Sequence, residues 1–170
     1  MGLTNDERSS LVELRLEKAK RFIAEAEQML SMGLWDLAAN RFYYSCFHAA
    51  QALLIHYGLS AHTHAGTLGV FGMNFVKTGK IDKELGAFFS RMEQLRMKAD
   101  YNCEYDVSNS DVENMLQPAH DFLNSIIKLI TTNPKVTTAQ IAVVYPRTIS
   151  PEPQKNDFWV KVILHIIVFP

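Results

Sequence analysis

The chain has 170 residues, of which 48% are hydrophobic and 21% are charged, and its formal net charge at pH 7 is -1. This length suits one domain with a substantial core, and the composition is ordinary for a soluble globular protein. The near-neutral charge excludes a global basic field for nucleic acid or anionic membranes, so any RNA contact has to rest on a local patch.

Several features indicate a cytoplasmic protein that does not enter a membrane. Cys46 and Cys103 lie far apart and form no CxxC unit, which fits a reducing compartment. The polar start MGLTNDERSS does not have the pattern of a signal peptide. The most hydrophobic run, VILHIIVFP at residues 162–170, is well short of the roughly 20 residues that span a bilayer.

The first two helices are predicted from capping residues and apolar spacing. Thr4 and Glu7 form a capping-box start, and an amphipathic pattern then continues to about Gly33. A second helix is expected over residues 34–57, ending at Gly58. Because this second helix is apolar on nearly every face, we expect it to be buried in the centre of the fold.

Three further segments complete the predicted bundle. The loop SAHTHAG leads into a glycine-interrupted stretch, and another helix is expected over residues 82–103. The last helix opens near Ser108, with Ser110 and Glu113 as its capping box, and continues to about residue 132. Pro118 falls within this helix and is expected to bend it or delay its start.

The composition changes after Pro134. Residues 136–146 and 158–170 are β-branched and aromatic, and a linker-like SPEPQKND separates them. These segments could pair as two strands, pack on the bundle, or form a tail outside the core fold. The predicted organisation is therefore a helical bundle over residues 1–132 and a non-helical or strand-like C-terminal extension of unknown role over residues 133–170.

The stretch RFYYSCFHAA carries the first candidate site. Arg41 and His48 are seven positions apart, nearly two helical turns, so both project from one helix face with Tyr44 between them. Together they could hold a phosphate or a nucleotide. The alternative is structural: Arg41 pairs with an acidic group on a neighbouring helix, and His48 bonds to another partner. Spacing alone favours the structural interpretation.

The stretch RMKADY carries the second candidate. Arg96 and Asp100 are four positions apart and could form an ordinary intrahelical ion pair, followed directly by Tyr101. Asp100 could instead face the second helix and neutralise Arg41.

Metal and phosphate-loop chemistry are not expected. His56, His62 and His64 have no accompanying cysteine pair, and a zinc site needs three or four ligands. The glycines at 66, 69, 72 and 79 do not have phosphate-loop spacing, and close helix packing explains them better. No Ser-His-Asp or Cys-His arrangement is apparent. We therefore predict no metal, no cofactor and no catalytic residue.

Four segments taken together resemble the HEPN domain family: AANRFYYSCFHAAQALL, HAGTLGVFGMNFVKTGKI, LRMKADYN and the serine-capped final helix. The resemblance covers about residues 11–130. It implies an all-α, up-and-down bundle of four to five helices that commonly forms a homodimer. Many members of the family are metal-independent endoribonucleases, often toxins paired with a nucleotidyltransferase-like antitoxin, and others are non-catalytic nucleotide-binding or scaffold modules.

The nuclease members carry an Arg-x4-6-His motif, in which arginine holds the phosphate and histidine assists proton transfer. Arg41 and His48 match it by letter, but on the second helix rather than on the later helix expected for such nucleases. On the later helix, Arg96 is followed after four residues by Tyr101, where the motif has its histidine. A phenol is a poor general base at neutral pH.

The resulting prediction is a nucleotide- or RNA-associated module, the helical partner of a nucleotidyltransferase-like protein in a toxin–antitoxin type pair. Its anion site would be one polar cluster between the second and fourth helices, formed by Arg41, Tyr44, His48, Arg96, Asp100 and Tyr101. The alternatives are a metal-independent endoribonuclease and a non-catalytic protein-interaction module.

Overall fold

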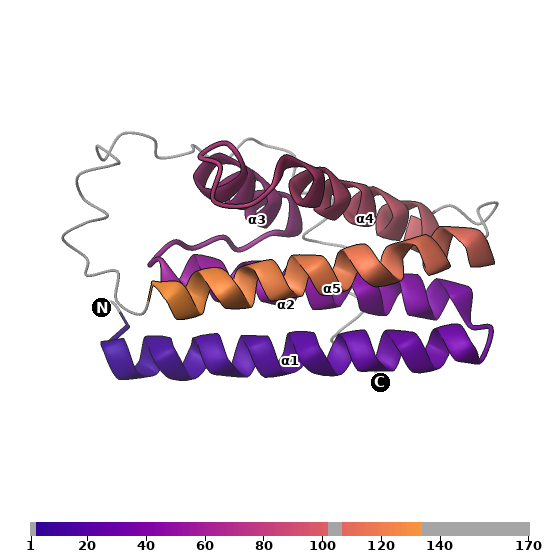
Figure 1. Cartoon of the computed structure of the whole chain (residues 1–170), viewed down its shortest axis with the longest axis horizontal. Helices are drawn as coiled ribbons and strands as arrows, with labels where there is room; N and C mark the ends of the chain where they lie inside the picture. The colour runs from indigo at the N-terminus through magenta and orange to yellow at the C-terminus, as the bar shows by residue number, and fades with distance from the viewer. Residues whose placement is uncertain (1–2, 102–106, 134–170) are drawn as a thin grey trace, which may run out of the picture.

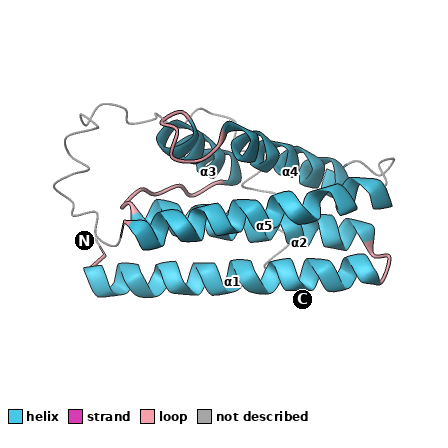
Figure 2. Ribbon diagram, in the orientation of Figure 1, coloured by secondary structure: helices cyan, strands magenta, loops and turns pink. Residues whose placement is uncertain are grey.

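The computed structural model describes residues 3–101 and 107–133, with side chains described up to Lys98 in the first of these ranges. Over these residues it confirms an all-α bundle without strands (Figure 1, Figure 2). The helices are α1 (Asn5–Ser31), α2 (Trp35–His56), α3 (His64–Phe71), the π-helical turn η1 (Gly72–Val76), α4 (Lys83–Tyr101) and α5 (Asn109–Thr132). The predicted C-terminal extension lies outside the described residues beyond Asn133.

α1 and α2 form a long hairpin that begins and ends as predicted. Thr4 caps α1 through the expected capping box with Glu7. Gly33 has a φ of +73° and Gly58 a φ of +69°, and each ends its helix in a left-handed conformation that favours glycine. The following amides bond back across the last turn, from Leu34 N to Met29 O at 3.0 Å and from Leu59 N to Leu54 O at 2.8 Å.

α2 is the central helix of the bundle, as its apolar composition predicted. It packs against α1, α3, α4 and α5, and in Figure 1 it lies between α1 and the α3–α4 layer. Its polar side chains inside the core are satisfied by these neighbours. Ser45 Oγ donates to the Ala19 carbonyl of α1 at 2.8 Å, and Gln51 Nε2 donates to Thr67 Oγ1 of α3 at 2.6 Å.

The glycine-interrupted segment folds as α3 followed directly by η1. The expectation that its glycines serve close helix packing is wrong for Gly69 and Gly72, because a Cβ at either position would meet nothing within 4 Å. Gly79 instead adopts a φ of +73° in the turn that follows η1. The glycine that does allow close packing is Gly86 in α4, where a Cβ would lie 2.7 Å from a methyl group of Val76.

α5 covers the remaining side of α2, and its start corrects one prediction. Its N-cap is Ser108, which forms a capping box with Asp111, whereas Ser110 and Glu113 were expected in these roles. Pro118 lies within the helix and does not delay its start, which is at Asn109. The buried face of α5 repeats at three and four residues, as an amphipathic helix requires: Val112, Met115, Ala119, Phe122, Leu123 and Ile126.

Candidate functional site

Arg41 meets an acidic residue of α1. Its Nε lies 3.1 Å from Oε2 of Glu25, and each of the two side chains is 34% exposed. The Nε atom is buried and makes no hydrogen bond, so this contact is an ion pair without hydrogen-bond alignment. The guanidinium also lies 5.2 Å from the centre of the Phe22 ring, and its Nη1 donates to Asn40. Arg41 therefore contacts an acidic group on a neighbouring helix, Glu25, and its role in anion binding stays a prediction.

His48 is buried under α1 and bonded to an arginine. Its side chain is 6% exposed, and Arg15 Nη1 donates to Nδ1 at 2.8 Å. The ring stacks on Phe22 with centroids 5.4 Å apart. Burial, followed by the positive charges of Arg15, Lys18 and Arg21, lowers the pKa of His48 from 6.5 to about 4. Since Nδ1 accepts a hydrogen bond from Arg15, the neutral ring carries its own proton on Nε2.

Three cations lie around the Phe22 ring, and a fourth, Arg15, bonds to the histidine that stacks on this ring. We call them the α1–α2 basic cluster: Arg15, Lys18, Arg21 and Arg41. Lys18, Arg21 and Arg41 have their charged groups 5.2–5.7 Å from the Phe22 ring centre. Among the described residues, Glu25 is the acidic group in ion-pair contact with the cluster, 3.6 Å from Arg21 and 3.1 Å from Arg41. The positive charge of the cluster thus exceeds the negative charge that contacts it.

A second polar network connects α2, α3 and α4. The Tyr43 hydroxyl and Nδ1 of His64 are hydrogen-bonded, and the His64 ring stacks on Phe47 at 4.4 Å. In α4, Arg96 donates through Nε and Nη2 to the carboxylate of Glu93 at 3.1 and 3.2 Å. The Arg96 guanidinium lies 5.2 Å from the centre of the Tyr43 ring. We call Tyr43, His64, Glu93 and Arg96 the tyrosine network.

Burial and charge shift the titration of this network. Burial, and then the nearby carboxylate of Glu93, raises the pKa of Tyr43 far above its ordinary value, so the phenol stays protonated. Burial and the positive charge of Arg96 lower the pKa of His64, and Glu93 partly opposes them. His64 is accordingly a neutral imidazole near pH 7, held at Nδ1 by a tyrosine that does not ionise.

The structure brings part of the predicted cluster together. The Tyr44 ring lies 6.5 Å from His48 and 6.0 Å from His64, and so connects the basic cluster to the tyrosine network. Arg96 pairs with Glu93 at i−3. The side chains of Asp100 and Tyr101 lie outside the described residues, so the predicted contacts of Asp100 with Arg41 or Arg96 remain predictions.

Several residues of the site were not predicted from the sequence. Arg15, Lys18 and Phe22 are partly buried residues of α1 and carry no motif. The Glu93–Arg96 pair has the i, i+3 spacing that is common on helix surfaces, and that spacing was available as a signal. His64 was considered as a metal ligand, and its contact with Tyr43, 21 residues away in the chain, was not predicted.

The described residues give no support to metal or thiol chemistry. They contain no group of three or more His, Cys, Asp or Glu side chains that could hold a metal ion. His56 Nε2 is 2.8 Å from the Asn133 carbonyl, and His62 is exposed. Cys46 is fully buried, and burial raises the pKa of its thiol far above the ordinary value, which makes it a poor nucleophile.

Comparison with known proteins decides the family. The model of the HEPN domain matches residues 12–130, which is well over half of the chain. The chain belongs to the HEPN domain family. The UPF0332 protein of Thermotoga maritima is 36% identical over 125 residues, covering 74% of this chain and 95% of that protein. The putative toxin MJ0142 of Methanocaldococcus jannaschii is 32% identical over 123 residues, covering 72% of this chain and 84% of that protein.

A solved structure has a similar fold. The crystal structure of TT1696 from Thermus thermophilus superposes with a TM-score of 0.61 and 15% sequence identity, covering 69% of this chain and 97% of that chain. The likeness concerns the fold alone.

Across the described ranges, none of the helices has the combination of length and apolar character needed to cross a membrane.

The depressed pKa of His48 predicts a pH-dependent stability. An unfolded imidazole takes up a proton near pH 6.5, whereas the folded one stays neutral down to about pH 4. The contribution of His48 to the free energy of unfolding is therefore fully present above pH 6.5. It falls by on the order of 2–3 kcal/mol as the pH falls toward 4. Urea denaturation at several pH values measures the effect, and His48→Gln should reduce this pH dependence.

The matched control is His62→Gln, which removes an exposed histidine of the neighbouring loop and should keep the wild-type pH dependence. His64 contributes in the same direction as His48, because its pKa is also lowered. A His48 resonance that titrates near pH 6.5 in NMR spectra of the folded protein would contradict the assignment.

Proposed function

We propose that this HEPN protein is the toxin-type component of a two-component pair and that its α1–α2 basic cluster binds the phosphates of RNA or of a nucleotide. Two proteins from M. jannaschii that are similar to this chain, MJ0142 and MJ0605, carry the name putative toxin. The observation that carries the binding proposal is the charge imbalance of the cluster, in which one carboxylate, Glu25, contacts two of the four cations, Arg21 and Arg41.

The state of His48 is central to this imbalance. Arg15 donates to an imidazole that is neutral at physiological pH, so the charge of Arg15 is not compensated by this partner. A phosphate at the cluster would supply the missing negative charge, and guanidinium groups bind phosphate oxygens in a forked geometry. Phe22 and Tyr44 lie beside the cations, with ring centroids 6.1 Å apart. Cations interleaved with aromatic rings are the chemistry that binds single-stranded RNA.

Two lysines of α1 provide a matched test of RNA binding. Lys18 lies at the Phe22 ring, whereas Lys20 lines the groove between α1 and α5. We expect Lys18→Gln to weaken binding of a fluorescein-labelled single-stranded RNA. The slope of the logarithm of the binding constant against the logarithm of the salt concentration should become shallower by about 0.7, the value for one lost phosphate contact. Fluorescence anisotropy over a salt series measures both quantities.

Lys20→Gln removes the same charge from the other face of the helix and should leave binding close to that of the wild type. Equal losses in the two variants would show that binding depends on overall charge, and the basic cluster would then not be the site.

The proposal includes a homodimer and a nucleotidyltransferase-like partner, as the family resemblance implies. If the chain acts as a toxin, its expression alone should slow bacterial growth. Co-expression with a nucleotidyltransferase-like protein encoded beside it should restore growth, and the two proteins should co-purify. Growth curves and affinity purification measure these outcomes. Unimpaired growth at high expression of folded protein would argue against the toxin role.

Metal-independent RNA cleavage is a second candidate, and the tyrosine network favours it. An arginine that contacts the scissile phosphate and a histidine that transfers a proton are sufficient for this reaction. Arg96 and His64 lie on different helices, but both contact Tyr43. The hydrogen bond to Tyr43 occupies Nδ1 of His64, which leaves Nε2 as the nitrogen that could exchange a proton with RNA.

Variants of two neighbouring histidines, His62 and His64, distinguish RNA cleavage from RNA binding alone. With RNA and excess EDTA, we expect cleavage by the wild type and by His62→Gln, and a loss of about 100-fold or more in His64→Gln. Anisotropy should show retained RNA binding in all three proteins. If the wild type binds RNA without cleaving it, the enzyme candidate is wrong and the binding function stands.

A further inference from the structure

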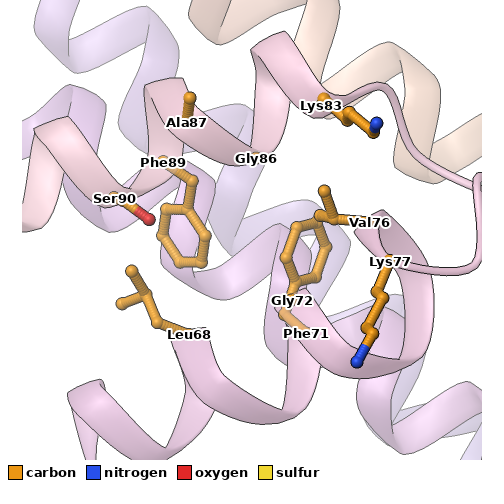
Figure 3. A pocket seen from close by; sticks show the side chains of 10 residues that line it. All are labelled: Leu68, Phe71, Gly72, Val76, Lys77, Lys83, Gly86, Ala87, Phe89 and Ser90. Carbon is orange, nitrogen blue, oxygen red and sulfur yellow. The ribbon is translucent and has the colours of Figure 1, made fainter.

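A pocket of about 360 Å³ lies between the α3–η1 segment and α4, away from the basic cluster. Figure 3 shows its walls, which are mainly apolar and aromatic. The side chains of Phe71 and Phe89 are each 1% exposed and form the base of the pocket, and Leu68 and Val76 lie at opposite ends (Figure 3). No residue of the basic cluster or of the predicted anion site lines this pocket.

The backbone of η1 and two glycines shape the pocket. η1 is a five-residue π-helical turn, a geometry that is rare and often found at functional sites. Gly72 lines the pocket, and a Cβ there would meet nothing within 4 Å, so the missing side chain leaves open space. Gly86 closes the opposite wall, since a Cβ there would lie 2.7 and 2.9 Å from the two methyl groups of Val76.

Two lysines lie at the Val76 end of the pocket. Lys77 follows η1 and Lys83 begins α4, and both residues line the pocket, with their amino groups on either side of this end and pointing away from each other (Figure 3). Both residues are exposed, and no ion pair is formed by either of them within the described ranges. An apolar floor beside two cations is complementary to a molecule with an apolar body and a negatively charged end.

We propose that this pocket binds a small amphipathic carboxylate, a short aliphatic or single-ring acid. The apolar body lies between Phe71, Phe89 and Leu68, and the carboxylate lies at the Val76 end, between Lys77 and Lys83. The volume is at the lower end of the range of about 300–1,000 Å³ that is usual for small-molecule pockets, which limits the ligand to this size. This site goes beyond the proposed function, because it shares no residue with the basic cluster and requires no RNA.

NMR titration of the ¹⁵N-labelled full chain with sodium octanoate tests the proposal. We expect saturable shifts of the Gly72 and Gly86 amide resonances, which report on the two walls of the pocket. 1-Octanol has the same apolar body without the charge, and sodium phosphate supplies an anion without the apolar body. Octanol should bind more weakly than octanoate, and phosphate should not shift these resonances.

Two glycines of the same segment provide matched variants. Gly72→Leu fills the pocket and should weaken octanoate binding by about tenfold or more. Gly69→Leu adds the same side chain at a position that does not line the pocket, where a Cβ also meets nothing within 4 Å. It should bind octanoate to within about twofold of the wild type. Because neither added Cβ clashes, both variants should fold, and circular dichroism checks this.

Replacing both lysines tests the charged end. The double variant Lys77→Gln/Lys83→Gln should lower the octanoate affinity by roughly fivefold and leave the octanol affinity unchanged. The proposal is overturned if octanoate gives no saturable shifts at Gly72 and Gly86, or if Gly72→Leu binds it as the wild type does. Equal affinities for octanol and octanoate would also overturn it, since the carboxylate would then play no part.

Discussion

Burial of α2 is the constraint on which the rest of the structure depends. This helix packs against four neighbours, and nearly all of its residues from Ala38 to Leu54 lie in the core. A buried polar group without a partner costs about 1–3 kcal/mol, so each polar side chain of α2 has to be met from another helix. Ser45 and His48 are met by α1, and Gln51 is met by α3. These bonds fix how α1 and α3 lie against α2.

The same constraint produces the electrostatics of the candidate site. A buried His48 stays neutral, and the group that bonds to it is the charged Arg15 rather than a carboxylate. The bundle therefore satisfies its core histidine in a way that leaves positive charge at its surface. Glu25 offsets part of this charge by contacting both Arg21 and Arg41. A local anion site can thus exist in a chain whose net charge is -1.

Aromatic rings connect the basic cluster to the tyrosine network. Phe22 lies against both His48 and Tyr44, and Tyr44 lies against His64. Groups from α1, α2 and α3 therefore belong to one contiguous network of rings and charges. The pocket between η1 and α4 is formed differently, by glycines and a π-helical turn rather than by polar contacts with α2. No residue of the basic cluster lines the pocket, although Phe89 of its floor stacks on Tyr43 of the tyrosine network.

Local sequence signals determined α1, α2, α4 and α5, most of their ends and the central position of α2, whereas α3 and η1 were predicted only as a glycine-interrupted stretch. The capping box at Thr4 and the glycines at 33 and 58 act within one or two turns of the chain, so their effects are readable without a fold. The apolar composition of α2 likewise predicts burial whatever its neighbours are. The predicted N-cap of α5, Ser110, lies two residues after the observed N-cap, Ser108. Both serines offer a capping hydroxyl and have an acidic residue three positions on, so the sequence did not separate them.

The partners of the site residues were decided only by tertiary structure. The sequence established that Arg41 and His48 share a helix face and that a buried arginine needs a partner. It did not identify Glu25 or Arg15, because Arg15 and His48 are 33 positions apart and meet through the rotation and register of two packed helices. The contact of His64 with Tyr43 depends in the same way on where the α2–α3 loop places α3. Spacing along one helix specifies a face, whereas the chemistry of that face depends on the side chains that the neighbouring helices place against it.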